Sequence, residues 1–501
     1  MELQFEPKTL HYLCKVLQET KCQEETIETI VPDSYPDVQQ MLCGSAFAVV
    51  RSKECHTGSI TVSGGIQAKT MYMAEGETTP RCLEAYLPFH VKVDSSDLTE
   101  SAQTIFRVWV RSVDVRMLNS RKIVIRVNLC WELVAYERRE ETLYDLQEKP
   151  EALQINAVEY TLPLPVETAQ RDFQMTERMS FPSARPLTGD VYRFMPRVEL
   201  TEKRLAGNKA VFKGVALFKA LYGTEDGKLA VQELEVPFSQ YCELSDIYEE
   251  DEMDLHLLLS GCETERMLTP DGETLSVTLQ ILAQCVVKQK NTVQMVQDAY
   301  CVGGNFSPKW AKYGFQNRLD KQTVSSTVRE SREMNVADVV QVWTTQEPVQ
   351  TVRVADGMQI TAPVNVSVLY QDGAGEYHFT GFRSEVTEKI PLHEKATCHV
   401  QFEVSGDVTA VPAGGGLELR YPVLMTLESY ADETYSCLCG GEMQLWEEKK
   451  KDRPAVIARR TRCGETLWDI AKASGTTVEK IRRANHLDTD STEAGVLLIP
   501  T

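Results

Sequence analysis

The feature that most constrains the fold of this 501-residue chain is an internal repeat. An apolar segment that ends in tyrosine occurs three times, and its last residues are Tyr72, Tyr222 and Tyr370, which lie 150 and then 148 residues apart. A turn rich in glycine and acidic residues follows each tyrosine. Copies of this length can each hold a core of their own, so the pattern indicates a tandem array of domains and not a solenoid of small repeats.

An Asp-Val pair recurs with nearly the same spacing as the tyrosines. Asp37-Val38, Asp190-Val191 and Asp338-Val339 each open a short apolar run. Because an aspartate can accept hydrogen bonds from the free N–H groups at a helix N-terminus, this pattern predicts a helix of one or two turns in each copy.

The last part of each copy alternates between apolar and polar residues. The apolar members are Ile125, Val127, Leu129, Trp131 and Leu133 in the first copy, Val277, Leu279, Ile281 and Ala283 in the second, and Leu417, Leu419, Tyr421, Val423, Met425 and Leu427 in the third. A period of two is typical of half-buried antiparallel strands, whose other side, with Cys130 and Glu132, would face solvent. We therefore predict a mainly β chain with three tandem antiparallel β-sandwich-like domains, at residues 1–150, 151–300 and 301–446.

The C-terminal segment has a different pattern. Residues 447–455 are highly charged and contain a proline, which predicts a short linker. In residues 456–501 a strand precedes two short helices, for which Thr466 and Thr477 are the predicted N-caps, and a second strand ends the segment. This order predicts a small βααβ domain.

The net charge of −20 is unevenly distributed. Residues 449–501 hold eleven basic and seven acidic residues, a balance of +4, so the rest of the chain carries −24. An acidic body argues against a nucleic-acid binder, which needs a basic face. The acidic N-terminus lacks the apolar run of a signal peptide, and no stretch reaches the length of a membrane span. We expect an intracellular protein whose fourteen cysteines are reduced and mostly buried.

The sequence offers little sign of catalysis. It contains no phosphate-binding loop, no nucleophile elbow and no zinc-ligand spacing, and the run Glu249-Glu250-Asp251-Glu252 is typical of a solvated surface. We therefore predict no enzyme activity, no cofactor and no metal; catalytic groups that converge only in space leave no such pattern in a sequence.

The string Val31-Pro32-Asp33-Ser34-Tyr35-Pro36-Asp37-Val38, with the tyrosine segment and the later Pro88-Phe89, resembles the SPOCS domain of spore-coat morphogenetic proteins. The second copy keeps Asp190-Val191 and Pro237-Phe238 but loses the proline-aspartate string, and the third copy is the most diverged. The resemblance covers most of the chain outside the C-terminal segment.

The C-terminal segment closely resembles a LysM domain. The matching strings are Gly464-Glu465-Thr466-Leu467-Trp468-Asp469-Ile470-Ala471, Thr477-Val478-Glu479-Lys480-Ile481, Asn485-His486-Leu487 and Leu498-Ile499-Pro500. LysM domains bind glycans that contain N-acetylglucosamine, such as peptidoglycan, in a groove between two loops. Carried over, the glycan- or partner-binding residues would be Gly464, Glu465, Thr466, Leu467, Trp468, Asn485, His486, Leu487 and Asp488.

Two departures from the LysM pattern leave the ligand open. Glu465 replaces the usual aspartate, and the loop before Gly495 lacks the isoleucine and proline that are frequent in the family. The module could therefore bind a protein instead of a sugar. A half-exposed Trp468 would suit an interface, and a basic docking surface could attract an acidic partner or glycan. Its members would be Arg459, Arg460, Arg462, Lys480, Arg482 and Arg483.

Together the resemblances imply a non-enzymatic spore-coat morphogenetic scaffold. Such a protein would be made in the mother-cell cytoplasm, would dock at the forespore surface through its LysM domain, and would recruit or encase coat proteins. The implied partners are the coat basement-layer ATPase and other coat proteins, and the LysM resemblance adds peptidoglycan or N-acetylglucosamine glycans as alternative ligands. Two alternatives remain: a peptidoglycan-binding cell-wall protein or hydrolase accessory, and a phage-type structural protein with a LysM tail.

Overall fold

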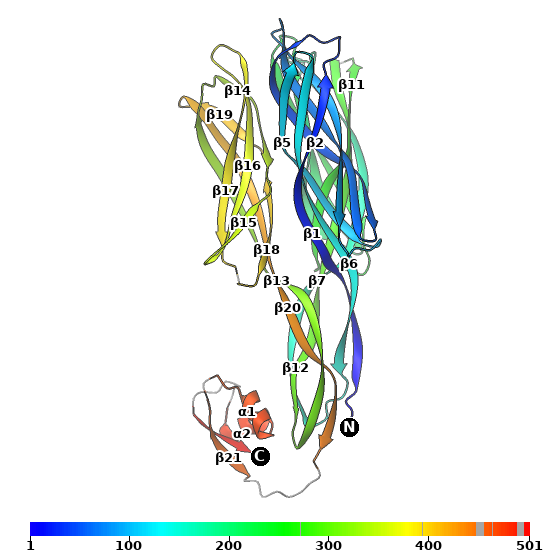
Figure 1. Ribbon diagram of the computed structural model, residues 1–501, viewed down its shortest axis with the longest axis vertical. Coiled ribbons are helices and arrows are strands. Elements are labelled where there is room, and N and C mark those ends of the chain that lie inside the picture. Colours follow the sequence, from blue (N-terminus) through cyan, green and yellow to red (C-terminus); the bar gives the residue numbers. More distant parts are fainter. Residues whose placement is uncertain (271, 393, 447–454, 463, 488–494, 501) are drawn as a thin grey trace.

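The computed structural model describes residues 1–270, 272–392, 394–446, 455–462, 464–487 and 495–500 (Figure 1). As predicted, the chain is mainly β, and its two helices lie near the C-terminus. Most of the predicted linker, 447–454, lies outside the described residues, and the predicted domain limits stay predictions. The strands fall into three groups, which we call repeats 1, 2 and 3, and a C-terminal module.

The bounds of the elements are as follows. Repeat 1 contains β1 (Phe5–Ile30), β2 (Val38–His56), β3 (Ser59–Ala74), β4 (Pro80–Asp94), β5 (Gln103–Asn119) and β6 (Lys122–Leu146). Repeat 2 contains β7 (Leu153–Ser180), β8 (Val191–Leu205), β9 (Lys209–Gly223), β10 (Leu229–Glu243), β11 (Glu252–Thr269) and β12 (Gly272–Cys301). Repeat 3 contains β13 (Gly304–Glu333), β14 (Asp338–Gln346), β15 (Gln350–Val354), β16 (Gly357–Gln371), β17 (Tyr377–Ile390), β18 (Thr397–Val404), β19 (Thr409–Ala413) and β20 (Gly416–Leu445). The C-terminal module contains β21 (Val456–Arg460), α1 (Leu467–Ser474), α2 (Val478–Asn485) and β22 (Val496–Pro500).

Each repeat folds its strands into two antiparallel sheets. The strand orders in repeats 1 and 2 are β1-β6-β5 with β2-β3-β4, and β7-β12-β11 with β8-β9-β10. In repeat 3 one sheet has the order β13-β20-β18 with β19 beside β20, and in the other sheet β14 and β15 share one side of β16 while β17 takes the opposite side. The core of repeat 1 lies between its sheets, where Ile66 of β3 and Ile125 of β6 are both fully buried. This arrangement is a β-sandwich.

The predicted short helices are absent from the described residues. Asp37, Asp190 and Asp338 instead lie at or just before the first residues of β2, β8 and β14. The alternating β-branched and apolar residues that follow fit a pleated strand better than a single helical turn. In repeat 1, Asp37 does not cap a helix but forms an ion pair with Arg121 (3.1 Å).

The polar side of the alternating strands is less exposed than predicted. Ile125, Val127, Leu129 and Leu133 are fully buried as expected, but Cys130 and Glu132 are also buried, at 0% and 7% exposure. Gln284 of repeat 2 is fully buried too, and its side chain bonds to both the N–H and the C=O of Phe106 in repeat 1. Around Glu132 and Gln284, this side of β6 and β12 faces the neighbouring repeats, whereas Arg126 and Gln280 on the same side are exposed.

The three repeats close a ring of similar contacts. Gln67 of repeat 1 donates to the carbonyl of Cys262 in repeat 2 (2.8 Å), and Asn365 of repeat 3 donates to the carbonyl of Arg111 in repeat 1 (3.3 Å). Arg197 of repeat 2 donates to the carbonyl of Val404 in repeat 3 (2.6 Å). One chain thus reproduces the head-to-tail closure of a cyclic trimer.

Six long strands continue beyond the sandwiches into a common stalk (Figure 1). They are the first and last strands of each repeat (β1, β6, β7, β12, β13 and β20), which have 25 to 30 residues each. Leu143, Met295 and Tyr435 come from different repeats and pack in one buried cluster in the stalk. The C-terminal module lies beside the lower end of this stalk (Figure 1).

Cysteine pairing differs in part from the prediction. Cys22 on β1 and Cys130 on β6 are direct cross-strand partners and form a disulfide, whereas we expected only thiols. Eleven other cysteines in the described residues are free. Most of these are buried, as a small apolar side chain should be.

Candidate functional site

The C-terminal module has the predicted βααβ order and a small core of its own. Leu467, Ile470, Ile481 and Ile499 are buried in this core. Thr466 caps α1 as predicted: its hydroxyl accepts from the N–H of Asp469 (3.2 Å), whose carboxylate accepts from the N–H of Thr466 (3.1 Å). This reciprocal pair is a capping box. Thr477 caps α2 in the same way, by accepting from the N–H of Lys480 (3.2 Å).

The first predicted loop of the ligand groove is held by ion pairing and capping. Gly464 is exposed and has a φ of 85°, a left-handed conformation that glycine adopts without steric cost. Glu465 forms an ion pair with Arg459 and accepts from the N–H of Arg462 (3.1 Å). Leu467 is fully buried, so its side chain belongs to the core and not to a groove wall.

The second predicted loop is fixed by an asparagine. The Asn485 side chain donates to the carbonyl of Leu498 (2.6 Å) and accepts from the N–H of the same residue (2.7 Å), which ties the end of α2 to β22. His486 is exposed and ends α2 with a φ of 53°. Leu487 is half-buried against the core, and Asp488 lies outside the described residues. Gly464, Thr466 and His486 are thus the predicted ligand residues that are exposed.

Trp468 is half-buried and already has a partner within the chain. Its indole Nε1 donates to Oδ2 of Asp298 on β12 (2.8 Å), and its ring meets that of Tyr300 edge to face, with centroids 4.9 Å apart. Lys472, one turn further along α1, pairs with both carboxylate oxygens of Asp298 (2.6 and 2.8 Å). The side chain that we expected to contact an external ligand therefore attaches the module to the stalk.

Two further features support this attachment. The Tyr300 hydroxyl donates to the carbonyl of Thr476 (2.9 Å), and Tyr300 is buried with the core residues of the module. Burial raises the pKa of Asp298, but the hydrogen bonds from Lys472 and Trp468 outweigh this and hold the pKa below its ordinary value. The carboxylate is therefore charged at neutral pH, and its interactions with α1 are charge-assisted.

The predicted basic surface is partly neutralised. Arg459 pairs with Glu465, and Arg483 pairs with Glu479 (2.7 Å). Arg482 is only half-exposed. The remaining members, Arg460, Arg462 and Lys480, are exposed and form no ion pair with any described residue.

The proline-aspartate string of repeat 1 forms a turn around one arginine. Arg121, from the β5–β6 turn, donates to the carbonyls of Val31 (3.0 Å), Pro32 (2.9 Å) and Tyr35 (2.6 Å). It also pairs with Asp37. The motif therefore has a structural explanation: it presents acceptors that a single guanidinium can satisfy.

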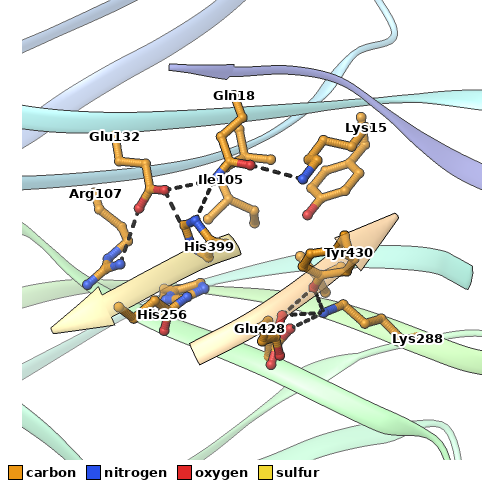
Figure 2. A pocket seen from close by; sticks show the side chains of 15 residues that line it. Lys15, Gln18, Ile105, Arg107, Glu132, His256, Lys288, His399, Glu428 and Tyr430 are labelled. Carbon is orange, nitrogen blue, oxygen red and sulfur yellow. Dashed lines mark hydrogen bonds and ion pairs between the residues drawn. The ribbon is translucent and has the colours of Figure 1, made fainter. Parts of the chain in front are cut away.

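Ionisable side chains from all three repeats meet in a small cavity of about 60 Å³ (Figure 2). Its charged and hydrogen-bonding groups are Lys15, Gln18, Arg107, Glu132, Tyr136, Asp254, His256, Lys288, His399, Gln401, Glu428 and Tyr430. Lys288 pairs with Asp254 (2.8 Å), and Arg107 pairs with Glu132 (3.2 Å). We call this group the central ionic cluster. The sequence did not reveal it, because its members come from seven separate strands.

The charges in this cluster balance one another. Burial raises the pKa of Glu132, but His399 and Arg107 hold it below its ordinary value. Burial, with a contribution from Arg107, lowers the pKa of His256 to about 4, so this imidazole is neutral at pH 7. Paired charges and a neutral histidine can be accommodated at a buried junction between repeats, because each buried charge there is balanced by a nearby charge of opposite sign.

One grouping in the described residues could in principle hold a cation. Ligand atoms of Asp372, Glu376 and His378 lie within 4.8 Å of one another on the β16–β17 turn. However, Asp372 Oδ1 already accepts from the N–H groups of Ala374 (2.9 Å) and Glu376 (3.0 Å), as in an ordinary turn. No metal site is assigned to it.

Comparison with known proteins gives two matches. A family model described as "SipL, SPOCS domain" matches residues 189–265, from the start of β8 into β11 of repeat 2. A model described as "LysM domain" matches residues 462–498. No curated protein and no solved structure matches the chain. Among the described residues, no helix is long and apolar enough to cross a membrane.

Both matched domains are non-catalytic binding modules, and together they fit a sporulation protein of the spore coat with a peptidoglycan-binding module. The chain thus carries a SPOCS domain and a C-terminal LysM domain, the combination that its sequence motifs predicted.

Proposed function

We propose that this protein is a non-enzymatic morphogenetic scaffold of the spore coat, which docks on the forespore surface through its LysM module and recruits coat proteins through its three-repeat body. The observation that carries the proposal is the attachment of the LysM module to the SPOCS-bearing body through Asp298 and Tyr300. A module attached in this way holds the body in a defined orientation when it docks, whereas a free tether would not.

The charge distribution supports different partners for the two parts. The body is strongly acidic, and the module exposes Arg460, Arg462 and Lys480 without ion-pair partners in the described residues. Such a basic patch favours association with an acidic protein or an anionic glycan. We propose the coat basement-layer ATPase as the protein partner and spore peptidoglycan as the glycan partner.

Localisation of the full chain tests the scaffold. A fluorescent fusion should form a shell around the forespore of sporulating cells, and removal of residues 456–501 should leave it diffuse in the mother cell. A fusion that stays diffuse with the module present would contradict the proposal. A fusion that forms the shell without the module would assign docking to the body instead.

A second experiment separates the two docking partners. The full chain with Arg460→Glu and Lys480→Glu is compared with the wild type for co-sedimentation with purified spore peptidoglycan and for binding to the purified ATPase. Arg204→Glu, an exposed position on β8, is the matched control. Loss of ATPase binding alone indicates a protein dock, and loss of co-sedimentation alone indicates a glycan dock. Wild-type protein that binds neither partner would reject both.

A further inference from the structure

Three equivalent positions of the repeats carry Cys43, Arg193 and Gln341. Each lies directly after a β-bulge and faces the residue that precedes the repeat's tyrosine: Cys43 pairs with Met71, Arg193 with Leu221, and Gln341 with Leu369. The three bulge residues, Leu42, Tyr192 and Val340, and the three facing residues belong to one apolar cluster. The equivalent positions therefore meet where the three repeats come together.

The polar groups at this junction lack partners. Arg193 and Gln341 are only 5% and 4% exposed. The Nε of Arg193 and both polar atoms of the Gln341 side chain are buried without a hydrogen bond. The ring of Trp343 covers the Arg193 guanidinium at 4.5 Å. Buried donors and a buried cation in native proteins normally have a partner, because leaving them unpaired is strongly unfavourable.

No described side chain supplies the missing negative charge. Arg193 forms no ion pair with any described carboxylate, and the ionisable neighbour that acts on it is Cys43. Burial raises the pKa of Cys43 to about 12, although Arg193 acts to lower it. Cys43 is therefore a neutral thiol at pH 7 and does not balance the guanidinium.

We propose that a small monovalent anion of the size of chloride binds at this junction, with the Arg193 guanidinium and the Gln341 amide as donors. The surroundings favour such a weakly hydrated ion, because Met71, Leu221, Leu369 and the Trp343 ring offer no groups to replace the hydration shell of a phosphate or sulfate. The bound anion would be shared by repeats 2 and 3 and would lie against Cys43 of repeat 1. It would thus hold the ring of repeats closed.

The test uses the full chain with chloride as the probe. Binding is followed by the excess line width of the ³⁵Cl resonance and its suppression by bromide. The thermal midpoint is measured in sodium chloride and in sodium gluconate of equal ionic strength. The wild type should broaden the resonance and unfold at a higher temperature in chloride, because a ligand that binds only the folded state stabilises it. Arg193→Met should lose both effects, and Arg204→Met, which removes an exposed charge from the same strand, should keep both.

If Arg193→Met does not fold, a second variant still tests the proposal. Gln341→Leu keeps the guanidinium and should weaken chloride binding by about tenfold, the usual effect of losing one hydrogen bond to a charged group. Wild-type protein with no excess line width would overturn the proposal and would leave water as the occupant. A chloride effect of equal size in the wild type and in either junction variant would overturn it as well.

Discussion

The indole of Trp468 and the carboxylate of Asp298 form a 2.8 Å hydrogen bond between α1 of the LysM module and β12 of repeat 2. Asp298 also receives both hydrogen bonds from Lys472, so a single carboxylate holds one face of α1. The module is therefore attached to the body, and the surface it can offer to a ligand is the one with the exposed residues Gly464, His486, Arg460 and Arg462.

Replacing this carboxylate should release the module. Asp298→Ala removes the acceptor for Trp468 and Lys472. We expect the attachment of the module to the stalk to weaken by about 2 kcal/mol, which is roughly thirtyfold in the equilibrium between attached and released module. Hydrogen exchange of the α1 amides and a larger radius of gyration in small-angle scattering would report the change. Glu159→Ala, at an exposed position of β7 in the stalk, is the control and should change neither quantity.

Acid should have the same effect on the wild type. The pKa of Asp298 lies below its ordinary value of 3.8 because the bonds from Lys472 and Trp468 outweigh the effect of burial. A lowered pKa in the docked state means that the carboxylate contributes its full stabilisation above the ordinary value and loses it as the pH falls through the lowered value. Small-angle scattering between pH 5 and pH 3 should show release of the module only in the most acidic samples, because an aspartate ordinarily titrates at roughly pH 3.5 to 4. Release already complete at pH 5 would contradict this role.

The turn around Arg121 should be sensitive to one substitution. Arg121→Ala leaves the carbonyls of Val31, Pro32 and Tyr35 without their donor, and we expect repeat 1 to lose about 2–4 kcal/mol of stability. Urea unfolding followed by hydrogen exchange in β1 and β2 would measure the loss. Arg126→Ala, on an exposed position of β6, should cost less than about 0.5 kcal/mol. Equal effects of the two substitutions would show that the turn does not depend on Arg121.

The sequence predicted what short-range patterns determine. Alternation over residues 125–133 predicted a strand whose apolar side is buried, and the Thr466 cap predicted the start of α1; both are confirmed. The match of family models to the SPOCS and LysM domains agrees with motifs that are contiguous in the chain.

What the sequence did not predict depends on contacts between repeats. Glu132 is a polar residue in an alternating strand, so it was assigned to solvent, but closure of the ring buries it, as it buries Gln284 in the corresponding strand of repeat 2. Trp468 was assigned to an external partner for a similar reason, since Asp298 lies 170 residues away in the sequence. Cys22 and Cys130 are 108 residues apart, and only the register of β1 on β6 brings them together.

The central ionic cluster should make the stability of the body depend on pH near neutrality. Burial and Arg107 lower the pKa of His256 from 6.5 to about 4. The unfolded chain therefore binds a proton at His256 below about pH 6.5 that the folded chain does not bind until about pH 4, and stability falls as the pH drops through this interval. We expect a loss of about 2–3 kcal/mol between pH 7 and pH 4 from this group.

His256→Gln should remove this contribution, because glutamine does not titrate. The other charged groups that act on His256, among them Asp254, Glu132 and Lys203, are present in both proteins, so the difference between wild type and variant reports the titration of the histidine together with its coupling to them. Urea unfolding at intervals of about half a pH unit from pH 7 to pH 4 gives that difference, since each unit of pKa shift corresponds to about 1.4 kcal/mol. Parallel stability curves for the two proteins would show that His256 titrates in the folded state as it does in the unfolded chain.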